Sequence, residues 1–175
     1  MSKHYSSGAD LSAKVLNGVN ILADNVASTL GPRGRTVLLQ RAGTGPFVSK
    51  DGVTVADHVV LDDPIENAAV HILKQASSQT NTLAGDGTTT SMVLARAILQ
   101  EAQKHIVAGT PPIEIKRAID RATEVLVANL KEASTPIQSE EDIAHIATIS
   151  ANNDETIGNL IAKAVDCVGK DGSIT

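Results

Sequence analysis

Apolar positions spaced three and four residues apart recur along most of the chain and predict a mainly α-helical protein. The expected helices begin at or near Asp10, Pro64, Thr88, Pro112, Ser139 and Asp154. The first is expected to end at Gly31-Pro32, because glycine can form a left-handed cap and proline cannot continue a helix. Residues 92–99 are apolar on nearly all sides, so we expect this helix to lie buried within a bundle.

Two of the later helices, which begin at Pro112 and Asp154, each have one apolar face that is expected to point inward. In the helix from Pro112 and in the helix from Asp154, the inward residues are expected to be Ile115, Ile119, Ala122, Val125 or Leu126, Leu130, Ile157, Leu160, Ile161, Ala164 and Val168. Between these two helices, Ala133-Ser134-Thr135-Pro136 indicates a linker and a domain boundary.

Two short β-like runs interrupt the helical pattern. Residues 36–40 and 47–49 flank a turn rich in glycine and proline, which predicts a projecting hairpin. A lone hairpin is only marginally stable in water, so we expect it to pair with another element, for example on a neighbouring subunit. Residues 173–175 resemble the start of a strand, and we expect the sequence to be part of a longer chain.

Composition and charge narrow the possible functions. The only aromatic residues are Tyr5 and Phe47, so the core must be built from aliphatic side chains. The formal net charge of −5, without a local Lys/Arg cluster, argues against nucleic acid as a partner. Cys167 is the single cysteine, which favours a reducing compartment. No stretch reaches the ~18 apolar residues of a membrane span, so we expect a soluble, cytoplasmic protein.

Residues 85–90, with the sequence Gly-Asp-Gly-Thr-Thr-Thr, form the strongest candidate for a ligand site. Glycine lets a ligand come close to the backbone. The threonines fall in the first turn of a predicted helix, where unpaired N–H groups and the helix dipole favour an anion such as phosphate. Asp86 would repel a bare phosphate, so it indicates a bridging Mg²⁺. A simple capped helix start remains the alternative interpretation of these residues.

Two other turns could approach the same ligand. Thr29-Leu30-Gly31-Pro32 is either a helix stop or a second place of close backbone approach, and Asp51 is either a turn residue or a second carboxylate over a nucleotide. The better-known phosphate loops are excluded. No Gly-Lys-Ser/Thr occurs, and Thr90 stands where a dinucleotide fingerprint needs a third glycine. The five histidines lack metal-ligand spacing.

Taken together, four motifs resemble the chaperonins in their order and spacing. They are Thr29-Leu30-Gly31-Pro32, Ser49-Lys50-Asp51-Gly52-Val53, Ala84-Gly85-Asp86-Gly87-Thr88-Thr89-Thr90 and Ala147-Thr148-Ile149-Ser150-Ala151-Asn152. The Lys-Asp-Gly-Val version of the second motif is similar to the group I branch, the bacterial GroEL type. The resemblance covers essentially the whole chain.

The resemblance implies a fold and an assembly. Residues 1–131 would form the first half of the equatorial helical bundle with its projecting β-hairpin, and residues 132–175 the ascending part of the α/β intermediate domain, the hinge. The apical domain and the C-terminal half would lie outside this sequence. The whole protein would be an ATPase built as a homo-oligomeric double ring of seven-membered rings. It would enclose non-native client proteins under a co-chaperonin lid. The alternative is a short nucleotide- or ring-binding module without its own ATP turnover.

The resemblance also implies a nucleotide site for ATP or ADP with Mg²⁺ and K⁺. Its binding residues would be Thr29, Leu30, Gly31, Pro32, Lys50, Asp86, Gly87, Thr88, Thr89, Thr90, Ile149 and Ser150. Asp86 would hold Mg²⁺, and Lys50 would lie beside the phosphates and the K⁺. Asp51 would position the attacking water, while the principal catalytic base is expected outside these residues.

Overall fold

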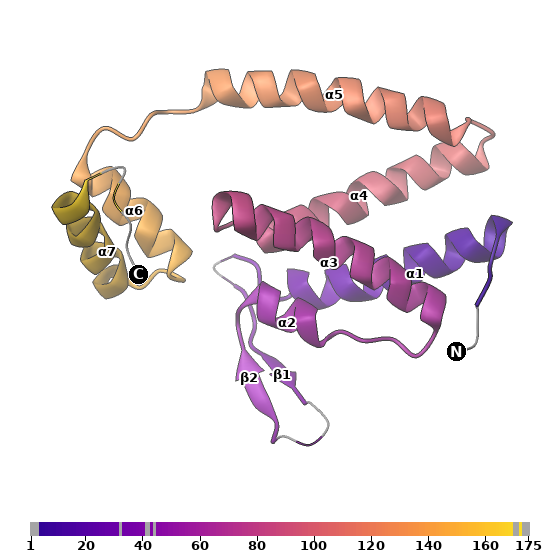
Figure 1. The fold of residues 1–175 in the computed structure, drawn as a ribbon, viewed down its shortest axis with the longest axis horizontal. Coiled ribbons are helices and arrows are strands. Elements are labelled where there is room, and N and C mark those ends of the chain that lie inside the picture. Colours follow the sequence, from indigo (N-terminus) through magenta and orange to yellow (C-terminus); the bar gives the residue numbers. More distant parts are fainter. Residues whose placement is uncertain (1–3, 32, 41–42, 44, 170–171, 173–175) are drawn as a thin grey trace. The chain divides into compact units, whose positions relative to one another are not determined.

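The computed structural model describes residues 4–31, 33–40, 43, 45–169 and 172 (Figure 1). This part of the chain is mainly α-helical, as the spacing of apolar residues predicts. Its elements are α1 (Gly8–Ala27), β1 (Val37–Leu39), β2 (Phe47–Ser49), α2 (Gly52–His58), α3 (Pro64–Ala84), α4 (Thr88–Val107), α5 (Pro112–Ala133), α6 (Glu140–Ser150) and α7 (Glu155–Val168). Among the described helices, none combines the length and the apolar character needed to cross a membrane.

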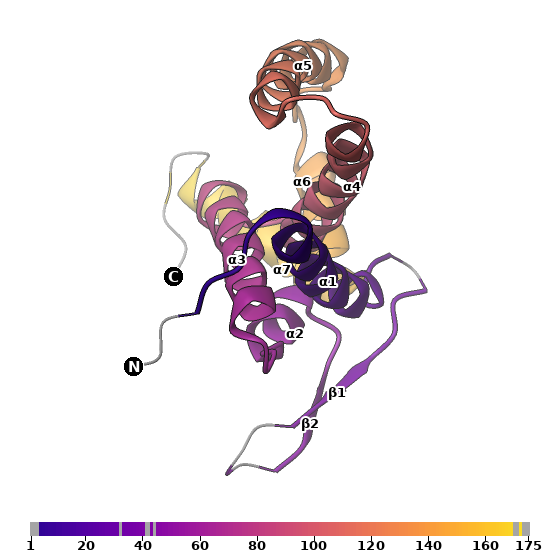
Figure 2. The same cartoon turned by 90° about the vertical axis from the view of Figure 1, so that its right-hand side faces the viewer.

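The chain divides into two compact units, Met1–Arg117 and Ala118–Thr175, and α5 runs through the division. In the first unit α1, α3 and α4 pack against one another, with the short α2 against all three (Figures 1 and 2). Their shared core is aliphatic. Its buried residues are Val19, Leu22, Val26, Leu39, Val55, Ala56, Ala69, Val70, Leu73 and Met92.

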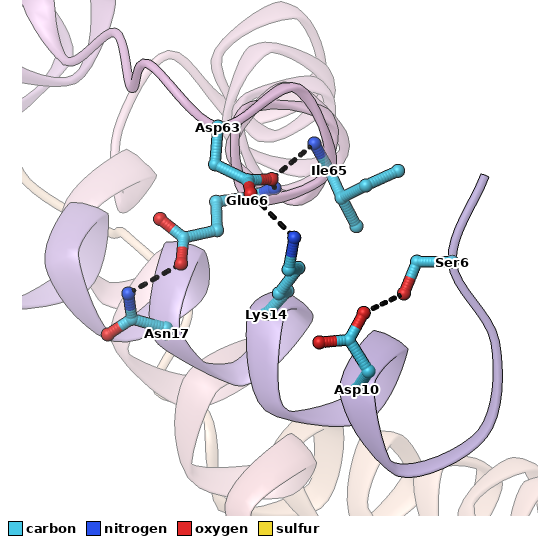
Figure 3. Close-up of polar contacts among 7 residues, drawn as sticks. All are labelled: Ser6, Asp10, Lys14, Asn17, Asp63, Ile65 and Glu66. Carbon is cyan, nitrogen blue, oxygen red and sulfur yellow. Dashed lines mark hydrogen bonds and ion pairs between the residues drawn. The ribbon is translucent and has the colours of Figure 1, made fainter. Parts of the chain in front are cut away.

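Helices α1 and α3 approach closely at one small residue. A β-carbon at Gly18 of α1 would overlap the carbonyl oxygen of Glu66. Polar side chains join the same two helices (Figure 3). Lys14 Nζ lies 2.7 Å from Asp63 Oδ2, and Asn17 Nδ2 donates to Glu66 Oε1 at 2.8 Å. Asp63 also caps α3, because its Oδ1 accepts from the backbone N–H groups of the first turn.

The Lys14–Asp63 pair makes the stability of this unit depend on pH. The hydrogen bond from Lys14 is the main cause that holds the pKa of Asp63 below its usual value, and the backbone N–H groups add to it. The contribution of Asp63 is therefore complete above the unfolded-state pKa of about 3.9 and disappears as the pH falls through the lower folded-state pKa. Thermal melts are expected to show that Asp63→Asn, which keeps a capping oxygen, loses this acid dependence.

The Asp63→Ala variant serves as the comparison, because alanine removes the cap together with the charge. At pH 7 its melting temperature is expected to fall further than that of Asp63→Asn. Equal melting temperatures would mean that the cap contributes nothing. If the melting temperature of Asp63→Asn falls at low pH as it does in the parent protein, another group is responsible for the acid dependence.

The predicted hairpin is confirmed. β1 and β2 pair antiparallel, with Val37 opposite Ser49 and Leu38 opposite Val48. The hairpin projects from the helices of the first unit (Figure 1). Leu39 reaches the core, whereas Leu38 and Val48 are exposed at 71% and 65%. The outer face of this small sheet is therefore apolar and uncovered by the described residues.

The end of one helix and the presence of another differ from the sequence-based expectation. Helix α1 ends at Ala27, not at Gly31-Pro32. The chain leaves the helix early because Thr29 N–H and Thr29 Oγ1 both donate to Val26 O, which tightens the last turn. Helix α2 was not expected at all. Its β-branched residues suggest a strand, but Asp51 satisfies the first N–H groups and starts a helix.

The expectation that α4 is buried all round is wrong for this chain. Of its residues only Thr88 and Met92 are buried, and Leu94 and Ile98 are exposed at 57% and 48%. Helix α5 has no buried residue among those described. The expected inward face was assigned from the apolar pattern, which identifies a face that can be buried but not the element that buries it.

The second unit contains α6 and α7 packed against each other. Both starts are confirmed, because Ser139 and Asp154 cap their helices through side-chain oxygens. The inward face of α7 was assigned wrongly. Gly158 and Ala162 face α6, since a β-carbon at Gly158 would overlap Thr148. The larger residues expected inside, Ile157, Leu160, Ile161 and Val168, are exposed.

Exposed apolar surface also lines a groove in the first unit. The groove has a volume of about 430 Å³, and its lining from α1, α3 and α4 includes Leu11, Val15, Ile65, Ile72 and Leu99. Ile72 is exposed at 69%. Surface of this kind favours association with another apolar partner. The strand expected at residues 173–175 lies outside the described residues.

Candidate functional site

Three turns that are far apart in the sequence meet at Gly52 in the first unit. Gly52 is buried, and a β-carbon there would overlap Thr89 Oγ1. The same β-carbon would lie 3.2 Å from Thr89 Cβ and 3.3 Å from Thr29 Oγ1. The turn after α1, the turn before α2 and the first turn of α4 are therefore in close contact. Glycine is the residue that this contact allows.

The start of α4 offers backbone donors to a ligand. Gly85 and Gly87 both have left-handed backbones, with φ of 72° and 81°, so the chain turns sharply on either side of Asp86. Gly87 is the N-cap of α4, and no side chain caps this helix. Helices α2, α3, α6 and α7 each begin with a side-chain cap. The first N–H groups of α4 thus remain available to an anion at the positive end of the helix dipole.

Asp86 lies between these two glycines and is exposed, and its Oδ1 accepts from Gly87 N–H at 2.6 Å. Among the described residues no group of three or more His, Cys, Asp and Glu could hold a metal ion. Mg²⁺ is commonly bound by one or two carboxylates together with substrate phosphates and water. The residues present therefore fit a Mg²⁺ that is bound together with a phosphate ligand, with Asp86 as the protein ligand.

Asp51 is the N-cap of α2, and its carboxylate accepts three hydrogen bonds. Its Oδ2 accepts from Thr54 Oγ1 at 2.6 Å and from Thr54 N–H at 2.9 Å, and its Oδ1 accepts from Val53 N–H at 3.4 Å. Partial burial would raise the pKa of Asp51, but these hydrogen bonds outweigh it and lower the pKa. Asp51 is consequently ionised at neutral pH. It is suited to accepting a hydrogen bond rather than to removing a proton.

The remaining predicted residues of the first unit lie in the turns before α2 and after α1. Thr29 is half-buried, Leu30 is exposed at 48%, and Gly31 has a φ of 76°. The turn after them is tight, because Gly34 N–H donates to Gly31 O at 2.9 Å. Pro32 lies outside the described residues. Lys50 is exposed in the short link between β2 and α2.

Ile149 and Ser150 end α6 in the second unit, and both side chains are exposed. A contact of Ile149 and Ser150 with the nucleotide stays a prediction.

The structure adds residues that the sequence did not indicate. Thr54 supplies two of the hydrogen bonds to Asp51. Lys74 of α3 holds the other end of α2, because its Nζ donates to Asp57 O at 3.1 Å and to Val59 O at 2.9 Å. Burial lowers the pKa of Lys74, and the nearby Asp57 partly opposes this shift. Thr54 could have been found from the sequence, because it stands three residues after the acid Asp51 at a helix start. No local sequence signal marks Lys74.

Two solved structures are similar to this chain. The chaperonin gp146 from the bacteriophage EL 2 (Pseudomonas aeruginosa), in the presence of ATP-BeFx, matches 95% of this chain with a TM-score of 0.77 and 24% identity. A group III chaperonin in the open state matches 90% with a TM-score of 0.76 and 24% identity. This chain spans 30% and 32% of the length of those two chains. At this identity the likeness establishes the fold alone.

The family of the chain is established by comparing its sequence with a family model. Residues 22–174 match the sequence model of the TCP-1/cpn60 chaperonin family. This match covers most of the chain and includes the turns that meet at Gly52. The chain therefore belongs to the TCP-1/cpn60 chaperonin family.

Proposed function

We propose that this chain supplies the N-terminal half of the ATP-binding domain of an ATP-dependent molecular chaperone, which encloses non-native proteins and assists their folding. The observation that carries the proposal is the junction at Gly52, where the Thr29 and Thr89 hydroxyls lie beside the uncapped start of α4. The Thr29 hydroxyl already donates to Val26 O, so the donors proposed for phosphate here are the Thr89 hydroxyl and the first N–H groups of α4. Such donors at a helix N-terminus are suited to the phosphates of a nucleotide.

The proposal includes an assembly. Residues 1–131 form the equatorial half-domain and residues 132–175 the start of the intermediate domain. The whole protein is a cytoplasmic, homo-oligomeric double ring of seven-membered rings with a co-chaperonin lid. The Lys50-Asp51-Gly52-Val53 motif supports the group I branch. The exposed Leu38 and Val48 of the hairpin support its pairing with a neighbouring subunit.

The residues have separate roles in this proposal. The N–H groups and hydroxyls at Thr88, Thr89 and Thr90 bind the phosphates, and Thr29 to Pro32 line the phosphate and sugar side. Bound with the nucleotide at Asp86, Mg²⁺ would neutralise phosphate charge. Lys50 lies beside the phosphates and the K⁺. Ile149 and Ser150 contact the nucleotide from the hinge side.

Asp51 orients the attacking water. Its lowered pKa keeps it ionised, so it serves as a fixed acceptor and leaves proton removal to a base elsewhere in the whole protein. In phosphoryl transfer, positioning and charge stabilisation supply most of the catalysis. A rigid carboxylate beside the phosphate donors meets this requirement.

The experiment that tests the function uses the native protein, isolated from its source with an antibody against these residues. Denaturing separation gives its polypeptide mass, and the same preparation is assayed for ATP hydrolysis and for refolding of a denatured client. We expect a polypeptide several times larger than 18.2 kDa that recovers client activity only with ATP. A preparation that binds nucleotide without turnover would instead favour the nucleotide- or ring-binding module. One that neither binds nor hydrolyses ATP would contradict the proposal.

A further inference from the structure

Thr54 controls most of the hydrogen bonding of the Asp51 carboxylate. It lies in the first turn of α2 and donates twice to the same oxygen, Oδ2, through Oγ1 at 2.6 Å and through its N–H at 2.9 Å. The other oxygen, Oδ1, accepts one long hydrogen bond of 3.4 Å from Val53 N–H. The two oxygens of one carboxylate are therefore in different environments.

We propose that Thr54 is a positioning residue, which fixes the Asp51 carboxylate so that Oδ1 is the oxygen that orients the attacking water. The inference rests on the proposed function, because it assigns a part in ATP hydrolysis. It adds a residue that none of the four chaperonin-like motifs contains.

The argument follows from acceptor capacity. Each carboxylate oxygen can accept about two hydrogen bonds. Thr54 fills that capacity at Oδ2 with two bonds of normal length, whereas the bond to Oδ1 is at the weak end of the range. A water molecule that needs an acceptor therefore finds it at Oδ1. Rotating the carboxylate plane away from its present orientation would break the 2.6 Å bond, so the Thr54 hydroxyl opposes that rotation.

The backbone beneath Asp51 is held from several sides, which leaves the side-chain torsions as its main freedom. Asp51 N–H donates to Ser49 Oγ at 3.1 Å, which ties the start of α2 to the hairpin. Gly52 packs against Thr89, and Lys74 holds the carbonyls at the far end of α2. Losing the Thr54 hydroxyl would leave the carboxylate held only by the backbone N–H groups of Thr54 and Val53, and so less firmly oriented, without moving the helix that carries it.

A purely structural role for Thr54 predicts a different outcome. As part of a capped helix start, Thr54 would contribute only to stability. Every variant without the hydroxyl would then lose activity only as far as it unfolds. A positioning role predicts a lower kcat with little change in KM, because the interaction is used in the transition state and not in nucleotide binding. It also predicts that removing the Thr54 hydroxyl no longer lowers kcat once Asp51 is replaced by a residue that cannot orient the water.

The test compares Thr54→Val, Thr54→Ser and the matched control Thr123→Val in the native full-length assembly. The Thr123 hydroxyl is also a hydrogen-bond donor, but it donates to the backbone carbonyl of Ile119 and not to a carboxylate, and Thr123 is exposed on α5. We expect Thr54→Val to lower kcat by about ten- to a hundredfold, the scale of a misplaced group in an active site. Thr54→Ser keeps the hydroxyl and is expected to stay within about threefold of the parent protein, since the donor geometry is retained. Thr123→Val is expected to leave kcat unchanged.

A double-mutant cycle with Asp51→Asn completes the test. In the Asp51→Asn background Thr54→Val is expected to have no further effect on kcat. Any one of three results would overturn the inference. They are a normal kcat in Thr54→Val, a kcat of Thr54→Ser as low as that of Thr54→Val, and additive effects on kcat in the cycle. If Thr54→Val does not assemble, Thr54→Ala is judged by the same criteria. A parent protein without ATP turnover would instead refute the proposed function, and this inference with it.

Discussion

Replacing Asp86 with alanine is expected to abolish Mg²⁺-dependent ATP turnover, with a loss of at least about a hundredfold, because a metal ion supplies several kcal/mol of charge stabilisation. The side chain is exposed, so the free energy of unfolding should change by no more than about 0.5 kcal/mol. The measurement is steady-state hydrolysis by the native assembly over a series of Mg²⁺ concentrations, together with a thermal melt of the same preparation.

Asp62→Ala is the matched control for this variant. Asp62 is also an exposed acid of the first unit, but it precedes the cap of α3 and lies in none of the three turns. Turnover and its Mg²⁺ dependence should be unchanged in the control. If Asp86→Ala hydrolyses ATP at the parent rate, the metal is held by other residues. If the variant melts at a much lower temperature, the loss of turnover cannot be assigned to the metal.

The sequence indicates the parts of the site better than their arrangement. Each turn carries local chemistry that can be read directly, namely glycines beside Asp86, threonines in a first helical turn and an acid at Asp51. Their meeting point could not be derived from these signals. The contact of Gly52 with Thr89 depends on how α2 packs under α4, and this packing is decided by the aliphatic core rather than by any residue of the turns.

The same distinction holds for the fold. The starts of α6 and α7 follow from Ser139 and Asp154, because a capping side chain acts within three residues of its own position. The start of α3 follows from Pro64, which is favoured in the first turn of a helix. The buried faces of α4, α5 and α7 were assigned less well. In α7 the small residues Gly158 and Ala162 face α6, since close approach of two helices excludes larger side chains there. An apolar pattern alone cannot distinguish close packing from an uncovered face.

Gly52→Ala should disrupt the junction on which the proposed site depends. Alanine has an intrinsic advantage of about 1 kcal/mol over glycine within a helix. The new β-carbon, however, would overlap Thr89 Oγ1, and overpacking of this kind typically costs about 1–3 kcal/mol. The overlap is expected to outweigh the advantage, because the new β-carbon would also lie 3.2 Å from Thr89 Cβ, a contact that rotation of the Thr89 hydroxyl does not relieve. We expect a lower melting temperature and at least about a tenfold loss of nucleotide affinity by calorimetric titration, since the phosphate donors of α4 move.

Two further variants separate displacement of the site from a general loss of stability. Gly45→Ala is the control for the added methyl group, because a β-carbon at Gly45 would meet nothing within 4 Å and its backbone is not left-handed. It should bind nucleotide normally. The double variant Gly52→Ala/Thr89→Ala removes the overlapping oxygen, so part of the melting temperature should return. Affinity should stay low, because the Thr89 hydroxyl is proposed to bind phosphate. If the double variant fully recovers its nucleotide affinity, Thr89 only fills space beside Gly52. If Gly52→Ala binds nucleotide with normal affinity, the nucleotide binds away from this junction.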